Sequence, residues 1–185
     1  MRIMILNKEK TLLVLYLLGI FLSLPLLLPY LLQTRYAAGA VRRACIIIDP
    51  GHGGVDGGAQ DALGHLEKNI NLAISLKIRD QLRQSGVNVV MTREDDTELA
   101  RVERAKKAKA LFLVSIHCDW STDAKRRGMV AFYYYRDQNG KNLALTIQEE
   151  LNKIQASPQK AAPGKYFVLE QPGISGVIVE VGFLS

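Results

Sequence analysis

Three short segments of the chain each place an imidazole or a carboxylate at the end of an apolar run. The runs and their polar residues are 46–48 with His52, 111–116 with His117, and 176–181 with Glu180. Apolar runs of this length predict buried strands, and the Pro and Gly residues around His52 predict a loop. Ligands collect outside the carboxyl ends of strands in open α/β sheets, so the two histidines are expected to converge. This pattern predicts a metal site at one edge of a sheet.

Glu67 is the best candidate for a third metal ligand. It opens the segment 68–85, in which apolar residues recur near helical spacing and after which Gly86 supplies a stop signal. A carboxylate at the start of that helix is expected to face the strand ends. Two imidazoles and one carboxylate leave a fourth tetrahedral position open, as catalytic zinc requires. Glu180 is then free to act as a general base on the attacking water.

Several other polar residues near these segments have alternative interpretations. His65 lies in a polar loop two residues before Glu67, where a solvated or substrate-facing role is favoured over metal binding. Asp49 and Asp56 are expected to form loops, although Asp49 could instead orient a ligand imidazole, as metal-bound histidines commonly need. Cys118 adjoins His117 and is a secondary candidate ligand.

The two cysteines are expected to remain free thiols. Cys45 begins its predicted strand, whereas Cys118 follows the end of another. If the strands are parallel neighbours, those ends lie about five residues apart at roughly 3.3 Å each, beyond the reach of a disulfide. Cys118 is expected to be the more reactive thiol because it adjoins the predicted metal.

The order of predicted elements indicates a single α/β domain over 41–185, with a largely parallel sheet and helices on both faces. The segment 128–134 follows the third strand without an intervening helix, so it is expected to be an edge or antiparallel strand. The predicted strands are 44–48, 87–92, 111–116, 128–134, 166–169 and 177–181, and the predicted helices are 67–85, 98–108 and 141–154.

Taken together, these motifs resemble the zinc-dependent N-acetylmuramoyl-L-alanine amidases of bacterial cell walls, and within them the membrane-associated type that acts on spore cortex. The resemblance covers residues 45–185. It rests on five motifs in the right order, which are Asp-Pro-Gly-His-Gly-Gly at 49–54, Leu-Glu-Lys-Asn at 66–69, Met-Thr-Arg at 91–93, Ser-Ile-His at 115–117 and Val-Glu-Val-Gly-Phe-Leu-Ser at 179–185. It implies zinc ligation by His52, Glu67 and His117, and catalytic acid/base chemistry by Glu180.

Two features depart from the family pattern. Asp119 stands where the family usually has Asn, and it could compete as a ligand, raise the pKa of the attacking water or cap the following turn. The sequence ends at Ser185, where family members continue through a loop and a last helix. The strand bearing Glu180 is therefore expected to lack a covering helix, which makes a catalytically dead wall-binding module an alternative to an active enzyme.

The first forty residues differ in composition from the rest. Residues 11–32 carry no charge, and at about 1.5 Å per residue a helix of that length spans roughly 33 Å, enough for a bilayer core. Ala38-Gly39-Ala40 also looks like a processing site. An uncleaved anchor is favoured over secretion after cleavage near Ala40. The charges that flank the segment do not settle its orientation, so export toward the cell wall is expected from the wall substrate that the resemblance implies.

The net charge of +6 does not indicate nucleic-acid binding. Four of the 24 basic and one of the 18 acidic residues lie in 1–40, which leaves 20 against 17 in the remainder. These basic residues are scattered rather than gathered with aromatic residues in a stripe. The resemblance implies peptidoglycan as substrate, with an exported accessory protein as a candidate partner. Residue chemistry alone predicts metal-assisted hydrolysis, so a zinc peptidase acting on wall peptides is the other alternative.

Overall fold

The computed structural model describes residues 45–97, 110–123, 125–170 and 173–184. The predicted anchor over 11–32, the processing site near Ala40 and the predicted helix 98–108 lie outside these ranges. Within them, no helix is long and apolar enough to cross a bilayer. The elements are β1 Cys45–Pro50, α2 Glu67–Gln84, β2 Asn88–Met91, β3 Phe112–Trp120, β4 Val130–Tyr133, α4 Gln138–Asn152, β5 Ala162–Pro163, the 3₁₀ helix η1 Phe167–Leu169 and β6 Ser175–Leu184.

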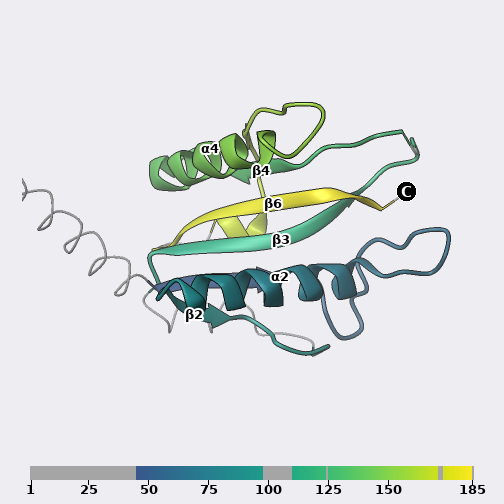
Figure 1. Cartoon of the computed structure of the whole chain (residues 1–185), viewed down its shortest axis with the longest axis horizontal. Helices are drawn as coiled ribbons and strands as arrows, with labels where there is room; N and C mark the ends of the chain where they lie inside the picture. The colour runs from purple at the N-terminus through teal and green to yellow at the C-terminus, as the bar shows by residue number, and fades with distance from the viewer. Residues whose placement is uncertain (1–44, 98–109, 124, 171–172, 185) are drawn as a thin grey trace, which may run out of the picture. The chain divides into compact units, whose positions relative to one another are not determined.

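A six-stranded sheet with the order β2-β1-β3-β6-β4-β5 forms the centre of the domain (Figure 1). The pairs β1–β2, β1–β3 and β3–β6 are parallel, which confirms the largely parallel sheet. β4 runs antiparallel to β6, as one reading of 128–134 predicted, but β5 pairs with its other side, so β4 is not an edge strand. The parallel strands run toward the same edge of the sheet, where β3 and β6 extend beyond the end of β1, and the site lies at this edge.

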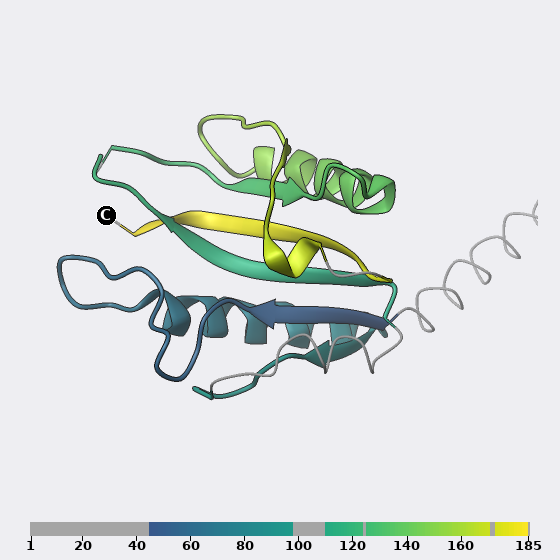
Figure 2. The same ribbon diagram turned by 180° about the vertical axis from the view of Figure 1, so that it is seen from behind.

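Both described α-helices cover the same face of the sheet. Ile74 and Ile78 of α2 and Leu143 and Ile147 of α4 pack against one core cluster centred on Val177 and its neighbours. The opposite face carries η1, seen in front of β3 and β6 in Figure 2. Val168 of η1 packs there with Ile47 and Leu113. The sequence predicts helices on both faces of the sheet, whereas both described α-helices lie on one face. The helix expected over 98–108 lies outside the described residues.

The predicted strand 166–169 is wrong. Leu169 donates its backbone N–H to the Tyr166 carbonyl, which closes a 3₁₀ turn instead of a ladder. Leu169 is buried in this turn and Phe167 is exposed, so the segment follows a three-residue rather than a two-residue period. An apolar run of only four residues, 166–169, next to Pro163 and Gly164 does not distinguish a short strand from such a turn.

α2 carries a buried polar stripe at its amino end. Glu67, Asn71 and Ser75 are buried at a spacing of four residues, so they lie on one side of the helix. Ile74 and Ile78, near the middle of the helix, make apolar contacts with the sheet. These contacts anchor the helix, and its first residues present polar side chains to the site.

Candidate metal centre

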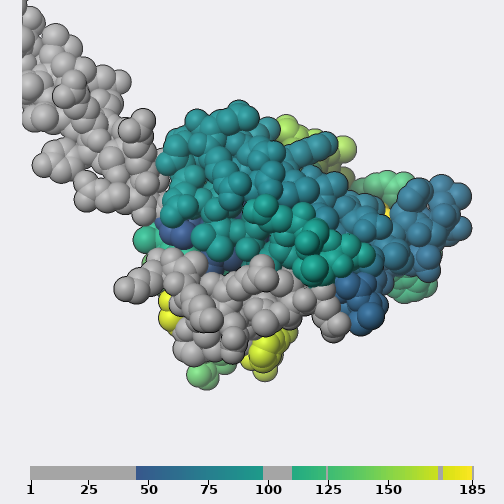
Figure 3. All heavy atoms as spheres, turned by 90° about the horizontal axis from the view of Figure 1, so that it is seen from below, coloured from purple at the N-terminus to yellow at the C-terminus, as the bar shows by residue number. Residues whose placement is uncertain are grey.

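The loop after β1 holds His52 in a left-handed backbone conformation. His52 has a φ of 61°, which costs a non-glycine residue about 1–2 kcal/mol. The buried Arg93 fixes the start of this loop, because its guanidinium donates to the carbonyls of Pro50 (3.1 Å) and Gly51 (3.0 Å). Another N–H donates to the Lys68 carbonyl at 2.7 Å. Arg93 therefore ties the histidine loop to the start of α2, and Figure 3 shows that loop, in blue, extending past the teal helix.

The structure brings His52, Glu67 and His117 together. One candidate ligand atom from each residue lies within 4.8 Å of the other two. His52 Nε2 is 3.1 Å from Glu67 Oε2, and His117 Nδ1 is 3.1 Å from Glu67 Oε1. The two imidazole rings meet edge to face at 5.0 Å between centroids. Two imidazole nitrogens and a carboxylate converging on one point are a donor set that suits a divalent transition metal.

Glu67 is held as an anion. Burial opposes its ionisation, but hydrogen bonds from His117, His52, the Ala59 N–H and Asn71 outweigh burial and keep its pKa well below the usual range. Oε2 accepts from the Ala59 N–H at 2.9 Å, and Oε1 accepts from Asn71 Nδ2 and the Cys118 N–H, each at 3.0 Å. A buried carboxylate this well supplied with donors is fixed in place and charged, as a metal ligand must be.

Asp56, and not Asp49, orients the imidazole of His52. His52 Nδ1 lies 2.8 Å from Asp56 Oδ2, so Asp56 holds a proton on Nδ1. Nε2 faces Glu67, to which it donates when the ring is protonated, and it offers a lone pair to a cation when the ring is neutral. Asp49 is buried inside the sheet, where it accepts from Thr92 Oγ1 and Ser115 Oγ at 2.6 Å each. Asp49 lies within β1, so the expectation that it forms a loop is wrong, and so is the alternative that it orients a ligand histidine.

The hydrogen bond to Glu67 raises the pKa of His52 above its ordinary value, and Asp56 adds to this effect while burial opposes it. Protons therefore compete with a cation for Nε2 more strongly than they would at an ordinary histidine. Metal affinity should fall as the pH drops through that raised pKa.

Gly51 leaves room for the His117 ring. A Cβ at position 51 would lie 2.3 to 2.6 Å from three atoms of that imidazole. We expect Gly51→Ala to push the ring away from Glu67 and to weaken zinc binding by roughly 10–100-fold, the range seen when support of a ligand is lost. Competition with a chromophoric chelator measures this affinity.

Gly57→Ala is the matched control for that measurement. Position 57 lies in the same loop, and its added Cβ would meet the tip of the Leu66 side chain at 3.3 Å, where a flexible group can yield. If Gly51→Ala binds zinc as tightly as wild type, the present position of the His117 ring is not required for metal binding.

Glu180 lies beside His117 in the sheet. The two residues are direct partners in the β3–β6 register, so their side chains leave the sheet on the same face. Burial raises the pKa of Glu180 to about 7, with His117 opposing the shift and Asp119 and Glu67 adding to it. Its Oε2 is buried and has no hydrogen-bond partner among the described residues. A carboxyl group of this pKa can both take up and release a proton near neutral pH.

The remaining predicted residues stay outside the cluster. His65 pairs with Asp61 at 2.7 Å and is exposed, as expected for a residue that does not bind metal. Asp119 accepts from the N–H of Trp120 at 2.8 Å and contributes to the raised pKa of Glu180. Cys118 directs its backbone N–H to Glu67, and its thiol is not among the clustered ligand atoms.

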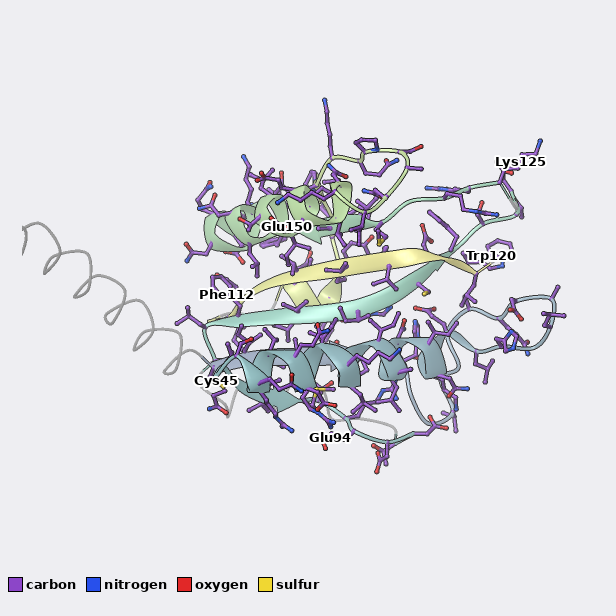
Figure 4. All side chains as sticks on the ribbon, viewed as in Figure 1. Cys45, Glu94, Phe112, Trp120, Lys125 and Glu150 are labelled. Atoms are coloured by element: carbon purple, nitrogen blue, oxygen red, sulfur yellow. The ribbon has the colours of Figure 1, made fainter. Side chains whose placement is uncertain are left out.

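Both cysteines are free, as predicted. Cys45 lies at the opposite end of the sheet from Trp120, which is two residues past Cys118 (Figure 4). Burial raises the thiol pKa of Cys118 to about 11, which keeps it protonated in the metal-free protein, so its predicted reactivity depends on the metal beside it.

A mostly parallel α/β sheet with two histidines and a carboxylate at its carboxyl edge, and a second carboxyl group beside them, is the arrangement of a metal-dependent hydrolase. The chain belongs to the N-acetylmuramoyl-L-alanine amidase family (Amidase_3), whose family model matches residues 46–185. The relatives and structural neighbours named below are amidases, a class of hydrolase.

A germination-specific N-acetylmuramoyl-L-alanine amidase of Bacillus subtilis is 33% identical over 159 residues, which cover 76% of this chain and 67% of the relative. The CwlD amidase of Clostridioides difficile, solved in complex with the GerS lipoprotein, is 34% identical with a TM-score of 0.69 and covers 77% of this chain and 83% of that one. The amidase AmiC2 of Nostoc punctiforme is 31% identical with a TM-score of 0.69 and covers 77% and 81%.

Proposed function

We propose that the protein is a zinc-dependent amidase that hydrolyses the bond between N-acetylmuramic acid and L-alanine in peptidoglycan. The observation that carries this proposal is the convergence of His52, Glu67 and His117 beside Glu180 in a chain of this family. A zinc ion held by these three residues would supply Lewis acidity, which polarises an amide carbonyl and acidifies water.

Glu180 is assigned the proton transfers. With a pKa of about 7 it is partly ionised at neutral pH, and its ionised form can accept a proton from the attacking water. The protonated group can then deliver that proton to the departing alanine nitrogen. The unpartnered Oε2 suits this role, because no hydrogen bond of the described protein has to break before it receives a proton.

The pH profile of the rate should report this carboxyl group. Its ionised form is the base, so kcat/KM should rise with pH as Glu180 loses its proton and then level off. A bound cation favours the anion, which places the midpoint at or below 7. Rates of zinc-loaded protein on muramoyl peptide between pH 5 and 8 measure the profile, and a rate that falls steadily over this range would exclude Glu180 as the base.

Digestion of purified peptidoglycan tests the bond that is cleaved. An amidase releases the stem peptide with a new alanine amino terminus and leaves a free lactyl carboxylate on the glycan. Cleavage confined to bonds between amino acids would show a peptidase instead, and binding without cleavage would show a wall-binding module. Mass spectrometry of the soluble fragments distinguishes these results.

The partners and location belong to the same proposal. Peptidoglycan lies outside the cytoplasmic membrane, so we propose that the protein is exported and that residues 11–32 anchor it, with cleavage near Ala40 as the alternative. The similarity to an amidase solved with a lipoprotein supports an exported accessory protein as partner. Fractionation of cells that produce a tagged chain tests the location.

A further inference from the structure

A basic loop connects the strand of His117 to the strand beside Glu180. This β3–β4 loop (residues 121–129) begins after Trp120 and ends just before Val130, the residue that pairs with Glu180 across β4 and β6. It holds Lys125, Arg126 and Arg127 in succession. Figure 4 shows Lys125 near the tip of the loop, at the same end of the molecule as Trp120.

The loop is held in place at its turn and at its base. The Lys125 N–H donates to Asp123 Oδ1 at 2.9 Å, and the Arg126 N–H donates to the Asp123 carbonyl at 2.9 Å, which closes a turn. At the base, the Met129 N–H donates to Gln155 Oε1 at 2.7 Å. The basic side chains therefore start from a defined backbone.

Arg126 is positioned by an aromatic ring. Its guanidinium lies 4.7 Å from the centroid of Phe183, and Phe183 follows Glu180 by three residues on β6. Stacking on a ring engages the face of a guanidinium and leaves its N–H edge available to donate. Lys125 is also exposed. Two cationic groups are thus held at the edge of the sheet where the metal cluster and Glu180 lie.

The substrate supplies a matching charge. A stem peptide joined to muramic acid through its amino end has no free ammonium there, but it retains its carboxyl terminus and any acidic side chains. Such an anion meets three carboxyl groups at the site, from Glu67, Asp119 and Glu180. Cations beside the site would offset that repulsion and fix the stem by charged hydrogen bonds.

Resting on the function proposed above, we infer that Arg126 and Lys125 form a subsite for the carboxylates of the stem peptide. The loop binds muramoyl peptides with free stem carboxylates more tightly than muramoyl peptides with amidated ones. Arg126, stacked on Phe183, sets the direction of the contact, and the exposed Lys125 adds a second positive charge.

The test compares two synthetic muramoyl peptides that differ only in free or amidated stem carboxylates. Their binding to the full chain is measured by calorimetry in the Glu180→Gln background, where cleavage is expected to be slow, and the peptides are checked for cleavage afterwards. The acid form should bind roughly tenfold or more tightly than the amide, since one charged hydrogen bond has about that value. Arg126→Gln should bring this ratio close to one by weakening only the acid form, and Lys125→Gln should lower it partly.

Arg136→Gln is the matched control. Arg136 also stacks on an aromatic ring, with its guanidinium 5.2 Å from the centroid of Tyr135, but it follows the opposite end of β4 and should leave the ratio unchanged. Equal weakening of both peptides in Arg126→Gln would reduce Arg126 to a structural role. No acid preference in the starting protein, or stronger binding of an anionic wall polymer than of either peptide, would overturn the subsite.

Because this measurement needs no turnover, it separates the two proposals. Wild-type protein that fails to cleave either peptide but shows the Arg126-dependent preference would refute the amidase and keep the subsite. Cleavage of both peptides with equal kcat/KM in wild type and in Arg126→Gln would keep the amidase and refute the subsite.

Discussion

Replacing Glu180 by glutamine is expected to reduce hydrolysis of muramoyl peptides by about 10²–10⁴-fold while zinc stays bound. The amide keeps the shape of the side chain but cannot accept a proton from water at neutral pH. Glu180 is not among the clustered ligand atoms, so the metal content should not change. Turnover by chromatography and zinc by elemental analysis, on the same preparation, give both quantities.

The same substitution should not destabilise the metal-free protein. Burial raises the pKa of Glu180 to about 7, above its ordinary value of 4.5, so the anion is disfavoured in the folded state. The free energy of unfolding therefore declines as the pH rises from 4.5 through 7. Glutamine removes this dependence, and at pH 8 the melting temperature of Glu180→Gln should equal or exceed that of wild type.

Glu149→Gln provides the matched control, because Glu149 is an exposed carboxylate on α4. It should leave turnover, zinc content and melting temperature unchanged. Near-normal turnover in Glu180→Gln, or loss of its zinc, would require a different role for Glu180.

The positions of the site residues could be predicted because they follow from the sheet. The apolar run before His117 and the run that contains Glu180 predict the two parallel strands that carry these residues, although β3 and β6 continue past them to Trp120 and Leu184. Parallel pairing of β3 with β6 then makes them neighbours across a distance of 63 residues in sequence. α2 runs from Glu67 to Gln84, close to the helix 67–85 that the apolar spacing and the stop signal at Gly86 predict.

The contacts that support the ligands were missed. Asp49 was expected to form a loop, with orientation of a ligand histidine as the alternative, but it belongs to β1 and pairs with Ser115 in the register, which directs it to hydroxyl groups inside the sheet. Asp56 takes that role because the left-handed residue His52 turns the loop back on itself. Such turns depend on backbone angles that hydrophobic periodicity does not report.

Arg93 belongs to the Met-Thr-Arg motif at 91–93, and the sequence alone assigns it no role. Its position after β2 carried a usable signal, because an arginine next to a buried strand must find acceptors to be buried. It meets the carbonyls of Pro50, Gly51 and Lys68, which lie 25 to 43 residues away in sequence. The sequence indicates that such an arginine needs partners, while the fold decides which carbonyls it reaches.

Loss of either histidine is expected to remove zinc from the protein. His52→Ala and His117→Ala each delete one of three predicted protein ligands and leave Glu67 with one imidazole, so zinc should fall well below stoichiometric levels after dialysis against a mild chelator. Activity should be lost with the metal, because water is then neither acidified nor held against the amide carbonyl.

His65→Ala is the control that makes the result specific. This third histidine of the chain is exposed and paired with Asp61, outside the cluster, so its replacement should leave one zinc per chain. Circular dichroism before and after chelation separates loss of metal from loss of fold. Stoichiometric zinc in His52→Ala or His117→Ala would exclude that histidine as a ligand, and equal loss of zinc in His65→Ala would place the metal elsewhere.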